Sequence, residues 1–418
     1  MTERCDRRDF LKMGTAAMTA WAAGGVSLAA EIRQPPIETV RIGLVGVGSR
    51  GSWLLELLLG LKGVQVKAVC DIVEKRVAKA QDMVTAKGQP KPNGYSRGET
   101  DFERLCESED LDLVINAVRP WRWHVPISVA AMKAGKHTGT EVPAAETIEG
   151  CWELVETAET TKKYCVILEN CCYFRNVMLV HNMLRQGLFG QVRHCEAGYQ
   201  HYLPTTPGAP RPADPIVQTA NSYPTHAIGP VAQWMDINRG DQFDYLVSMS
   251  ADGTKGYPAA DINTSLIRTV SGRTITLYYD TELPRPYDLI YRVQGTQGIY
   301  SATLDKIYIE GRSPKNCTWE PMDEYYKQYD HPLWKAFSAK AIVQGGHGNA
   351  DLLTLRRLIE ALQTGRAPDI DVYDAAAWSC ITELSEKSVA KRSRPMDFPD
   401  FTRGRWKTTP PIGIIGLD

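Results

Sequence analysis

Short strand-like runs alternate with segments of helical spacing over residues 40–169. The strand-like runs cover 40–45, 64–70, 113–118, 137–141 and 164–169, and the helical segments cover 52–61, 75–86, 127–134 and 148–161. A nearly continuous apolar run, as at 40–45, is typical of a strand buried on both faces of a parallel sheet. The alternation of strands and helices predicts a doubly wound parallel sheet of the α/β class, in a first domain over 40–170.

The pattern changes in the second half of the chain. Apolar and polar residues partly alternate in turn-separated segments at 191–202, 244–250, 264–270, 273–280, 288–294 and 306–310, and helical spacing returns at 349–364 and 372–391. Partial alternation is typical of an antiparallel sheet with one covered face. We therefore expect an α+β domain over 171–418, with a large open antiparallel sheet and C-terminal helices that return to the first domain.

The first 30 residues have the order of a secretory signal. Arg7 and Arg8 precede a weakly apolar run that ends in small residues at Ala30, and the paired arginines indicate the twin-arginine route. A transmembrane anchor is the alternative, but the run is about as short as the shortest spans and is rich in Gly, Ala and Thr. We expect residues 1–30 to be removed, 31–39 to form a linker, and the mature protein to be periplasmic or exported without a membrane span.

The amino-acid composition and net charge of the chain limit its possible binding partners. The 418 residues are enough for two buried cores, and the net charge of −1 gives no electrostatic case for nucleic acid or an anionic membrane. Of the ten cysteines, Cys5 leaves with the signal, and the remaining odd number cannot all pair. Their spacing shows neither a C-x-x-C motif nor a zinc pattern. We expect buried free thiols, as at Cys70 and Cys165, and no metal site.

A glycine-rich loop follows the first strand and opens the first helix. Its sequence is Gly46-Val47-Gly48-Ser49-Arg50-Gly51. Gly46 permits the tight turn, Gly48 lets a pyrophosphate approach the backbone, and Gly51 allows close packing of helix on strand. The amides at the start of the helix attract phosphate, so Ser49 and Arg50 are also expected to bind the cofactor. The loop predicts a dinucleotide site.

Residues at the ends of the next strands support that prediction. Asp71 stands twenty residues after Gly51, and a carboxylate there binds ribose hydroxyls and repels a 2′-phosphate, which favours NAD over NADP. Trp121 and His124 follow the strand that ends at Val118, and we expect them to contact the nicotinamide ribose. Trp123 is as well explained by a buried domain interface. A structural glycine turn with a surface aspartate is the alternative to the whole site.

At these residues the chain resembles the glucose–fructose oxidoreductase and inositol dehydrogenase superfamily, whose members carry a Glu-Lys-Pro turn with the lysine near the reacting carbinol. Here the turn is Glu141-Val142-Pro143, without the lysine. This turn, together with Leu168-Glu169-Asn170-Cys171-Cys172-Tyr173 and Tyr223-Pro224-Thr225-His226, resembles glycoside hydrolase family 109. Similar strings lie at 229–233, 238–241, 243–246, 283–287, 346–348, 372–378 and 401–404, so the resemblance covers nearly the whole mature chain.

The resemblance implies an NAD-dependent α-N-acetylgalactosaminidase. In such an enzyme NAD⁺ takes hydride from carbon 3 of the sugar, a base removes the acidified proton at carbon 2, the glycosidic oxygen leaves, water adds and the hydride returns. No outside oxidant is consumed, and the pair of carboxylates of ordinary glycosidases is not needed. A cofactor that is never released suits the expected export route, because twin-arginine substrates cross the membrane folded.

The resemblance also implies the site residues. His226 and Tyr173 are expected to move protons, Glu141, Val142 and Asn170 to hold the cofactor, and Tyr199, Arg211, Tyr223, Pro224 and Thr225, with His226, to bind sugar. A buried structural histidine is the alternative for His226, and a core tyrosine is the alternative for Tyr173. For the later substrate-binding tyrosine of the family, neither Tyr300 nor Tyr308 is clearly favoured.

Two other functions stay open from the sequence. A sugar dehydrogenase of the same superfamily would accumulate NADH, and Val142 in place of the lysine argues against it. A non-catalytic sugar-binding protein would keep its function without His226. A small-molecule or glycan substrate is expected for the enzyme, and a two-fold homodimer is the commonest symmetric assembly.

Overall fold

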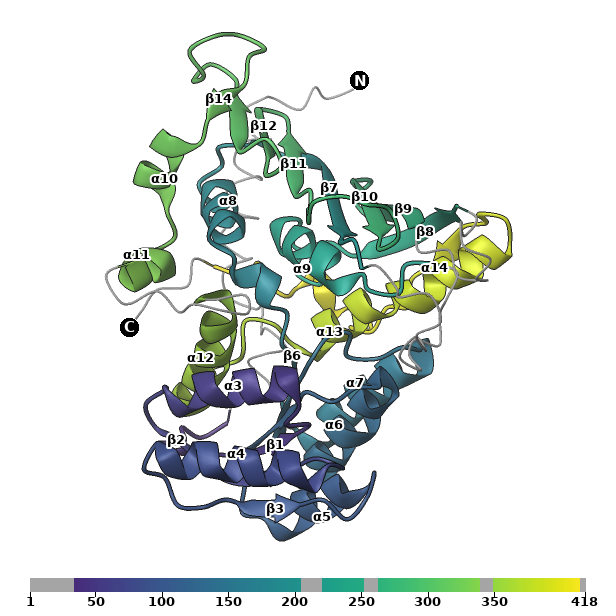
Figure 1. The fold of residues 1–418 in the computed structure, drawn as a ribbon. Coiled ribbons are helices and arrows are strands. Elements are labelled where there is room, and N and C mark those ends of the chain that lie inside the picture. The colour runs from purple at the N-terminus through teal and green to yellow at the C-terminus, as the bar shows by residue number, and fades with distance from the viewer. Residues whose placement is uncertain (1–33, 204–219, 252–261, 339–348, 414–418) are drawn as a thin grey trace, which may run out of the picture.

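The computed structural model describes residues 34–203, 220–251, 262–338 and 349–413. The expected signal at 1–30 and the expected sugar-binding Arg211 lie outside these ranges. Two sheets organise the described chain, one in the lower part of Figure 1 and one in its upper right. A single hydrophobic cluster of buried side chains runs through both, so the two halves share much of their core.

The first sheet has six parallel strands in the order β3-β2-β1-β4-β5-β6. The strands are β1 (Val40–Val45), β2 (Val64–Cys70), β3 (Asn93–Tyr95), β4 (Leu113–Asn116), β5 (His137–Thr140) and β6 (Cys165–Ile167). Between them run α3 (Ser49–Leu59), α4 (Glu74–Ala86), α5 (Asp101–Ser108), η2 (Trp121–Trp123), α6 (His124–Lys133) and α7 (Ile148–Thr161). The predicted doubly wound α/β sheet is confirmed.

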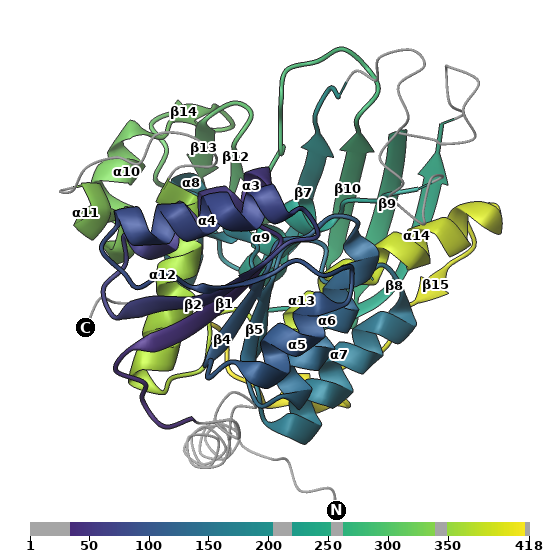
Figure 2. The same cartoon turned by 60° about the horizontal axis from the view of Figure 1, so that its bottom comes forward.

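Burial on both faces explains the apolar runs of this sheet. Ile42 and Leu44 are fully buried in the cluster that includes Leu54 and Leu58 of α3. Val45 belongs to a second cluster with residues of α5 and α6. Figure 2 shows these two layers, with α3 and α4 on one side of the strands and α5 and α6 on the other.

The strand register brings the chemically important segments to one edge. Val45 is level with Cys70 and Asn116, Asn116 with Thr140, and Thr140 with Ile167. The residues that follow these strand ends are the glycine-rich loop, Asp71, Val118 to Trp121, Glu141 and Glu169 to Asn170. In doubly wound sheets, ligands bind beyond this carboxyl edge.

The second sheet has nine strands in the order β14-β13-β12-β11-β7-β10-β9-β8-β15. They are β7 (Val192–Gln200), β8 (Phe243–Ser250), β9 (Ile262–Thr269), β10 (Thr274–Asp280), β11 (Arg292–Gly295), β12 (Gly298–Ser301), β13 (Lys306–Ile309), β14 (Glu320–Pro321) and β15 (Met396–Asp397). All pairs are antiparallel except β7 with β10, which is parallel. The predicted large antiparallel sheet is confirmed, and it contains this one parallel pair among the described strands. A parallel pair needs a crossover connection, and the long segment containing α9 (Thr225–Trp234), β8 and β9 supplies it.

The remaining helices join the two sheets. They are η3 (Asn170–Tyr173), α8 (Arg175–Arg185), α10 (Asp323–Tyr329), α11 (Pro332–Ser338), α12 (Asn349–Thr364), α13 (Val372–Ser379), α14 (Ile381–Ala390) and η4 (Arg405–Lys407). α9 packs on β7 and on η3, while α12 packs on α3, η3 and β1 of the first half. The predicted helix over 372–391 is two helices that meet at Cys380.

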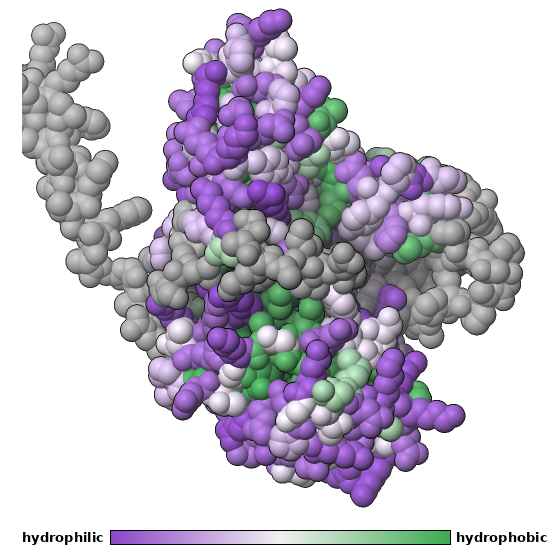
Figure 3. Space-filling view, turned by 60° about the vertical axis from the view of Figure 1, so that its left-hand side comes forward, coloured by the Kyte–Doolittle hydropathy of each residue, from purple (hydrophilic) through white to green (hydrophobic). Residues whose placement is uncertain are grey.

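The hydropathy of the surface and the burial of the cysteines match what the composition led us to expect. Figure 3 shows a mostly hydrophilic face, with hydrophobic residues gathered in a recess between its upper and lower parts. In the described part of the chain no helix has the length and apolar character needed to cross a bilayer. The described cysteines are free, and all but Cys317 are buried, as expected for Cys70 and Cys165.

Candidate active site

A large cavity lies at the carboxyl edge of the six-stranded sheet. Its volume is about 1150 Å³, and its lining includes the glycine-rich loop, the end of β2 and the segment after β4. Gly46, Gly48, Ser49, Arg50 and Asp71 all line it. This is enough room for a dinucleotide at the edge where such sheets bind one.

The three glycines are required for different reasons. Gly46 has a φ of 83°, in the left-handed region that favours glycine. A Cβ on Gly51 would lie 1.7 Å from the carbonyl oxygen of Gly46, so a side chain cannot fit between loop and helix. A Cβ on Gly48 would approach only the guanidinium of Arg76, at 3.6 Å, so the space beside Gly48 is left for a ligand. The predicted roles of the loop therefore match its geometry.

Asp71 both supports the loop and faces the cavity. Its Oδ2 accepts a hydrogen bond from the amide of Val47 at 3.1 Å, and its Oδ1 accepts one from the amide of Val73 at 2.9 Å. Arg76 lies 3.5 Å from the same carboxylate. The carboxylate is thus fixed by the backbone at the end of β2, where a ribose would be bound.

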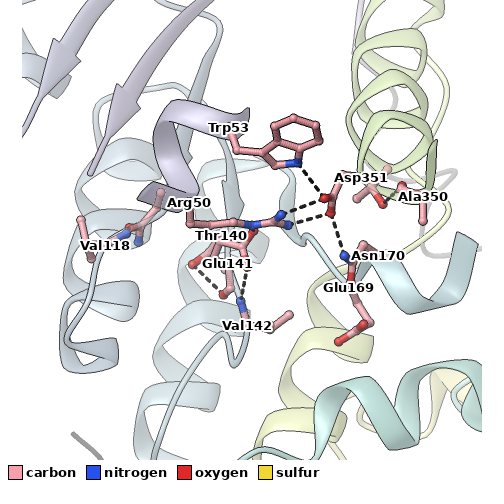
Figure 4. Close-up of polar contacts among 12 residues, drawn as sticks. Arg50, Trp53, Val118, Thr140, Glu141, Val142, Glu169, Asn170, Ala350 and Asp351 are labelled. Atoms are coloured by element: carbon pink, nitrogen blue, oxygen red, sulfur yellow. Dashed lines mark hydrogen bonds and ion pairs between the residues drawn. The ribbon is translucent and has the colours of Figure 1, made fainter. Parts of the chain in front are cut away.

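Arg50 turns away from the loop and joins two carboxylates. Its Nε donates to Glu141 at 2.7 Å, and both terminal nitrogens donate to Asp351 of α12 at 2.9 Å. Asn170 also donates to Asp351, at 2.7 Å, and so does the indole of Trp53, at 2.8 Å. Figure 4 shows these side chains converging on Asp351 from α3 and η3. Three predicted cofactor residues, Arg50, Glu141 and Asn170, therefore form one network, whose centre the sequence did not reveal.

His124 and Val142 do not lie in the cavity lining. His124 is fully buried, and its two ring nitrogens lie 2.6 Å from the carbonyl of Pro143 and 3.0 Å from that of Val118. It therefore ties the segment after β4 to the Val142-Pro143 turn, and the expected contact of His124 with a ribose is not supported. Val142 is buried, and its amide donates to Glu141.

Trp123, and not Trp121 as expected, lies at the cofactor cavity. Trp123 lines the cavity, whereas Trp121 is nearly buried and stacks on Tyr223, with ring centroids 5.4 Å apart. The guanidinium of Arg119, another lining residue, sits 4.8 Å from the Trp121 ring. Trp121 thus connects the wall of the cavity to the residues that the resemblance assigned to the sugar.

Those residues form an aromatic group around His226. The ring of Tyr223 lies 4.9 Å from that of His226 and 4.8 Å from that of Tyr199, and Tyr199 lies 5.8 Å from His226. Pro224 is the N-cap of α9, and Thr225 and His226 begin the helix, so the turn fixes their direction. The structure brings Tyr199, Tyr223 and His226 together as expected.

The two clustered tyrosines remain protonated near neutral pH. Burial raises the pKa of Tyr199 to about 12, and burial raises the pKa of Tyr223 well above 10, with the charge of Glu141 acting in the same direction. A neutral phenol donates hydrogen bonds to sugar oxygens and is a weak base. These tyrosines are therefore suited to orient a sugar through their hydroxyl groups.

Glu169 holds His226. Its Oε1 lies 2.7 Å from Nδ1 of His226 and accepts a further hydrogen bond from the amide of Cys171 at 3.1 Å. Although burial raises it, the charge and hydrogen bond of His226 hold the pKa of Glu169 below its ordinary value. A buried carboxylate on one ring nitrogen fixes the imidazole and directs proton transfer to the other nitrogen. Glu169 belongs to the string that carried the resemblance, but no role for it was predicted from the sequence.

Glu169, Cys171 and His226 are also the one group among the described residues with metal-ligating atoms close together, within 4.8 Å. Burial raises the pKa of Cys171 well above 9, which keeps it a thiol. Ligands of one zinc ion stand roughly 3.4 Å apart, whereas the carboxylate and imidazole here are at hydrogen-bond distance, 2.7 Å. The arrangement is that of an acid–base pair.

Tyr173 does not join this group, and its contacts do not support the expectation that it moves protons. Its hydroxyl donates to Asp369 at 3.0 Å, and its carbonyl accepts from the indole of Trp334 at 3.0 Å. Burial raises the pKa of Tyr173 well above 10, with the charge of Asp369 acting in the same direction. The core-tyrosine alternative fits these contacts.

Neither candidate for the later tyrosine reaches the aromatic group. Tyr300 is fully buried and accepts a hydrogen bond from Asn176, and Tyr308 of β13 donates to Glu310 at an exposed position just after that strand. Tyr287 does reach it, with its ring 6.1 Å from that of Tyr199 and with 45% of its surface exposed. Tyr287 ends the string 283–287 that contributed to the resemblance, which was the available signal.

Comparison with known proteins agrees with this division of the site. Residues 40–168 match the model of an oxidoreductase family with an NAD-binding Rossmann fold, and residues 173–207, 209–257 and 253–408 match the C-terminal domain of glycosyl hydrolase 109. A glycosyl hydrolase family 109 protein of Solibacter usitatus is 43% identical over 98% of this chain and 100% of its own length. One from Shewanella sp. strain ANA-3 is 42% identical over 98% of this chain and 99% of its own.

Solved structures share the fold at low identity. An oxidoreductase domain protein from Kribbella flavida has a TM-score of 0.72 at 17% identity and covers 87% of this chain and 100% of its own. Levoglucosan dehydrogenase, in complex with NADH and L-sorbose, has a TM-score of 0.71 at 17% identity, over 87% of this chain and 99% of its own. The family model and the full-length relatives decide the assignment: this chain belongs to glycosyl hydrolase family 109 and is a glycoside hydrolase with an NAD-binding Rossmann domain.

Proposed function

We propose that the protein hydrolyses an α-N-acetylgalactosaminide and keeps NAD bound throughout its catalytic cycle. The observation that carries this proposal is the continuous connection from the dinucleotide cavity to an acid–base pair. Arg119 lines the cavity and covers Trp121, Trp121 stacks on Tyr223, and Tyr223 packs on His226. A sugar between the cavity and His226 would meet both a redox cofactor and a group that moves protons.

The chain fits NAD in the part that binds phosphate and ribose. The space beside Gly48 is open, and the first amides of α3 point to it from a helix N-terminus. The carboxylate of Asp71 is held where it can accept hydrogen bonds from ribose hydroxyls and would repel a 2′-phosphate. Bound NAD⁺ supplies a reversible oxidation at carbon 3 of the sugar, which acidifies the proton at carbon 2 and allows the glycosidic oxygen to leave.

His226 is the residue that moves protons in this proposal. Its Nδ1 is engaged by Glu169, so exchange with the sugar goes through Nε2. Tyr199 and Tyr223 stay neutral and donate hydrogen bonds to sugar oxygens. Glu141 follows β5 and pairs with Arg50, and its carboxylate can accept a hydrogen bond from a sugar hydroxyl.

Three measurements on the purified protein test the proposal. Denaturation should release NAD that was never added to the preparation. Nitrophenyl glycosides of both anomers should show activity on the α-N-acetylgalactosaminide, and sugar released in deuterium oxide should carry deuterium at carbon 2. Product without that label, from an active enzyme, would exclude the elimination route.

The same assays separate the alternatives. A sugar dehydrogenase would accumulate NADH with a free sugar, measured by absorbance at 340 nm. A non-catalytic sugar-binding protein would bind the glycoside without turnover, and replacing His226 by alanine would change nothing. Export by the twin-arginine route, motivated by Arg7 and Arg8, predicts a shortened chain in the periplasmic fraction that is lost when both arginines are replaced by lysine.

A further inference from the structure

The carboxylate of Asp351 is the most heavily used hydrogen-bond acceptor near the proposed cofactor site. It accepts from both terminal nitrogens of Arg50, from the indole of Trp53 and from the amide of Asn170, at 2.7 to 2.9 Å. The Asp351 side chain has no exposed surface. A buried carboxylate with four donors is rigid, and so are the side chains that it holds.

The donors come from segments that are far apart in the chain. Arg50 of the glycine-rich loop and Trp53 lie one turn apart on α3, and Asn170 opens η3 after β6. Glu141 after β5 joins through Arg50. Asp351 lies on α12, which follows β14 in the chain. Figure 4 shows the long side chain of Arg50 reaching across to it.

In the described network one guanidinium, that of Arg50, joins the carboxylates of Glu141 and Asp351. Although burial lowers it, these carboxylates hold the pKa of Arg50 above its ordinary value, so the cation persists. The network lies by the ends of β5 and β6, in the half of the sheet that receives the nicotinamide in dinucleotide-binding folds.

We propose that Asp351 is a positioning residue for the cofactor: it fixes Arg50, Asn170 and, through Arg50, Glu141, and thereby lets the protein retain NAD. This inference rests on the proposed use of NAD. It assigns cofactor retention to the C-terminal helix α12 as well as to the glycine-rich loop.

The test compares Asp351→Asn with Asp112→Asn, a matched variant at the opposite edge of the same sheet. Asp112 precedes β4 and accepts two hydrogen bonds from Arg41, at 2.7 and 2.9 Å, in the same two-pronged way. It is also mostly buried, with 11% of its side chain exposed, and it does not line the cavity. Both variants lose a buried charge pair, so a purely structural effect should be alike in both.

Three quantities are measured for the wild type and both variants: NAD released on denaturation, the Kd values of NAD⁺ and NADH for protein stripped of cofactor, and the Tm of the stripped protein. We expect Asp351→Asn to retain less than about a tenth of the wild-type NAD, since loss of a charged hydrogen bond costs a factor of about ten or more. Its Kd values for NAD⁺ and NADH should both rise about tenfold or more. Asp112→Asn should retain wild-type NAD and wild-type Kd values, at a comparable loss of Tm.

Other outcomes separate the two proposals. Retention of wild-type NAD by Asp351→Asn, or equal losses in both variants, overturns the role of Asp351 and leaves the proposed function standing. A wild type that neither carries nor binds NAD overturns both. Should Asp351→Asn not fold, Trp53→Phe removes one donor and keeps an aromatic ring. Several-fold faster NAD dissociation from that variant is expected, and an unchanged rate overturns the inference.

Discussion

Glu169 and His226 meet through a 2.7 Å contact between Oε1 and Nδ1, although they are 57 residues apart in the chain. Glu169 is fully buried, just after β6, and His226 lies in the first turn of α9. The contact therefore joins the carboxyl edge of the six-stranded sheet to the first turn of α9. It fixes the ring of His226 relative to the cavity.

Replacing Glu169 by glutamine should lower kcat by roughly 100-fold or more, because the imidazole loses a charged carboxylate and the amide NH2 of glutamine can donate to Nδ1 and select the other tautomer. KM should change by less than about threefold, since the aromatic residues proposed to bind sugar are untouched. Steady-state kinetics on a nitrophenyl glycoside measure both. Glu196→Gln, at the Glu196 to Arg292 pair of the second sheet, is the control and should leave both values near those of the wild type. An unchanged kcat in Glu169→Gln would refute the positioning role.

Removing the hydroxyl of Tyr223 should lower activity with little change in stability, whereas removing that of Tyr173 should lower stability with little change in activity. Tyr223→Phe keeps the stacking on Trp121 but loses a donor to the sugar, and kcat/KM should fall about tenfold or more with little change in Tm. Tyr173→Phe loses a bond to the Asp369 carboxylate and should lower the free energy of unfolding by about 1.5–3 kcal/mol, with kcat within about twofold of the wild type. A large loss of kcat in Tyr173→Phe with unchanged stability would restore Tyr173 as a proton-transfer residue.

Gly48→Ala should weaken NAD binding, whereas Gly51→Ala should prevent folding. The added Cβ of Gly48→Ala meets no protein atom closer than 3.6 Å, so the Tm of the cofactor-free protein should stay within a few degrees of the wild type. The same methyl group stands in the space for the pyrophosphate, and the Kd for NAD should rise about tenfold or more. Gly51→Ala, 1.7 Å from the Gly46 carbonyl, should instead give little folded protein. Thermal melts with and without NAD distinguish the two. Undiminished NAD affinity in Gly48→Ala argues against a phosphate beside that residue.

Asp371 should make the stability of the protein fall as pH rises from about 4 to about 6. Burial raises the pKa of Asp371 to about 6, with the charge of Asp374 in the same direction and that of Arg239 opposed. The folded state thus favours the protonated acid, so this stabilisation is complete below about pH 4 and is lost as pH passes about 6. Asp371→Asn keeps an N-cap for α13 but does not titrate. The wild-type free energy of unfolding, relative to the variant, should decrease by roughly 1–3 kcal/mol over this range.

Asp112→Asn provides the control of opposite sign for that experiment. Although burial raises it, hydrogen bonds from Arg41 bring the pKa of Asp112 below its ordinary value. Its stabilisation is therefore present above about pH 4 and is lost as pH falls below that value. Urea denaturation of the three proteins between pH 3 and pH 7 measures both trends. Parallel curves for the wild type and Asp371→Asn would show that Asp371 has an ordinary pKa.

The sequence predicted the parallel sheet well because its strands are short and apolar and its turns carry glycine. It did not predict α9, where Gly229 and Pro230 lie within the helix. Both residues disfavour helix locally, but nearly every residue of α9 is buried between the two sheets, and tertiary packing overrides the local preference. The parallel pairing of β7 with β10 was likewise hidden, because alternation of apolar and polar residues does not report strand direction.

The site was predictable to the extent that its residues are neighbours in the sequence. The glycine-rich loop and the turn from Tyr223 to His226 could be recognised as short strings, and the structure places both where the cavity and the aromatic group are. Asp351 could not be found this way, because a lone aspartate on a helix carries no signal until folding brings donors to it. Tyr173 was misjudged for the converse reason, since its neighbours in the string reach the site and its own hydroxyl points to Asp369.

Arg50 and Asp351 are separated by 301 residues. A nascent chain that has completed the whole six-stranded sheet has Glu141 beside Arg50 but still lacks Asp351, which is added only when translation reaches α12. On the role proposed for Asp351, tight cofactor retention would follow synthesis of α12, and a truncated product ending before that helix should hold NAD weakly although its sequence contains the glycine-rich loop.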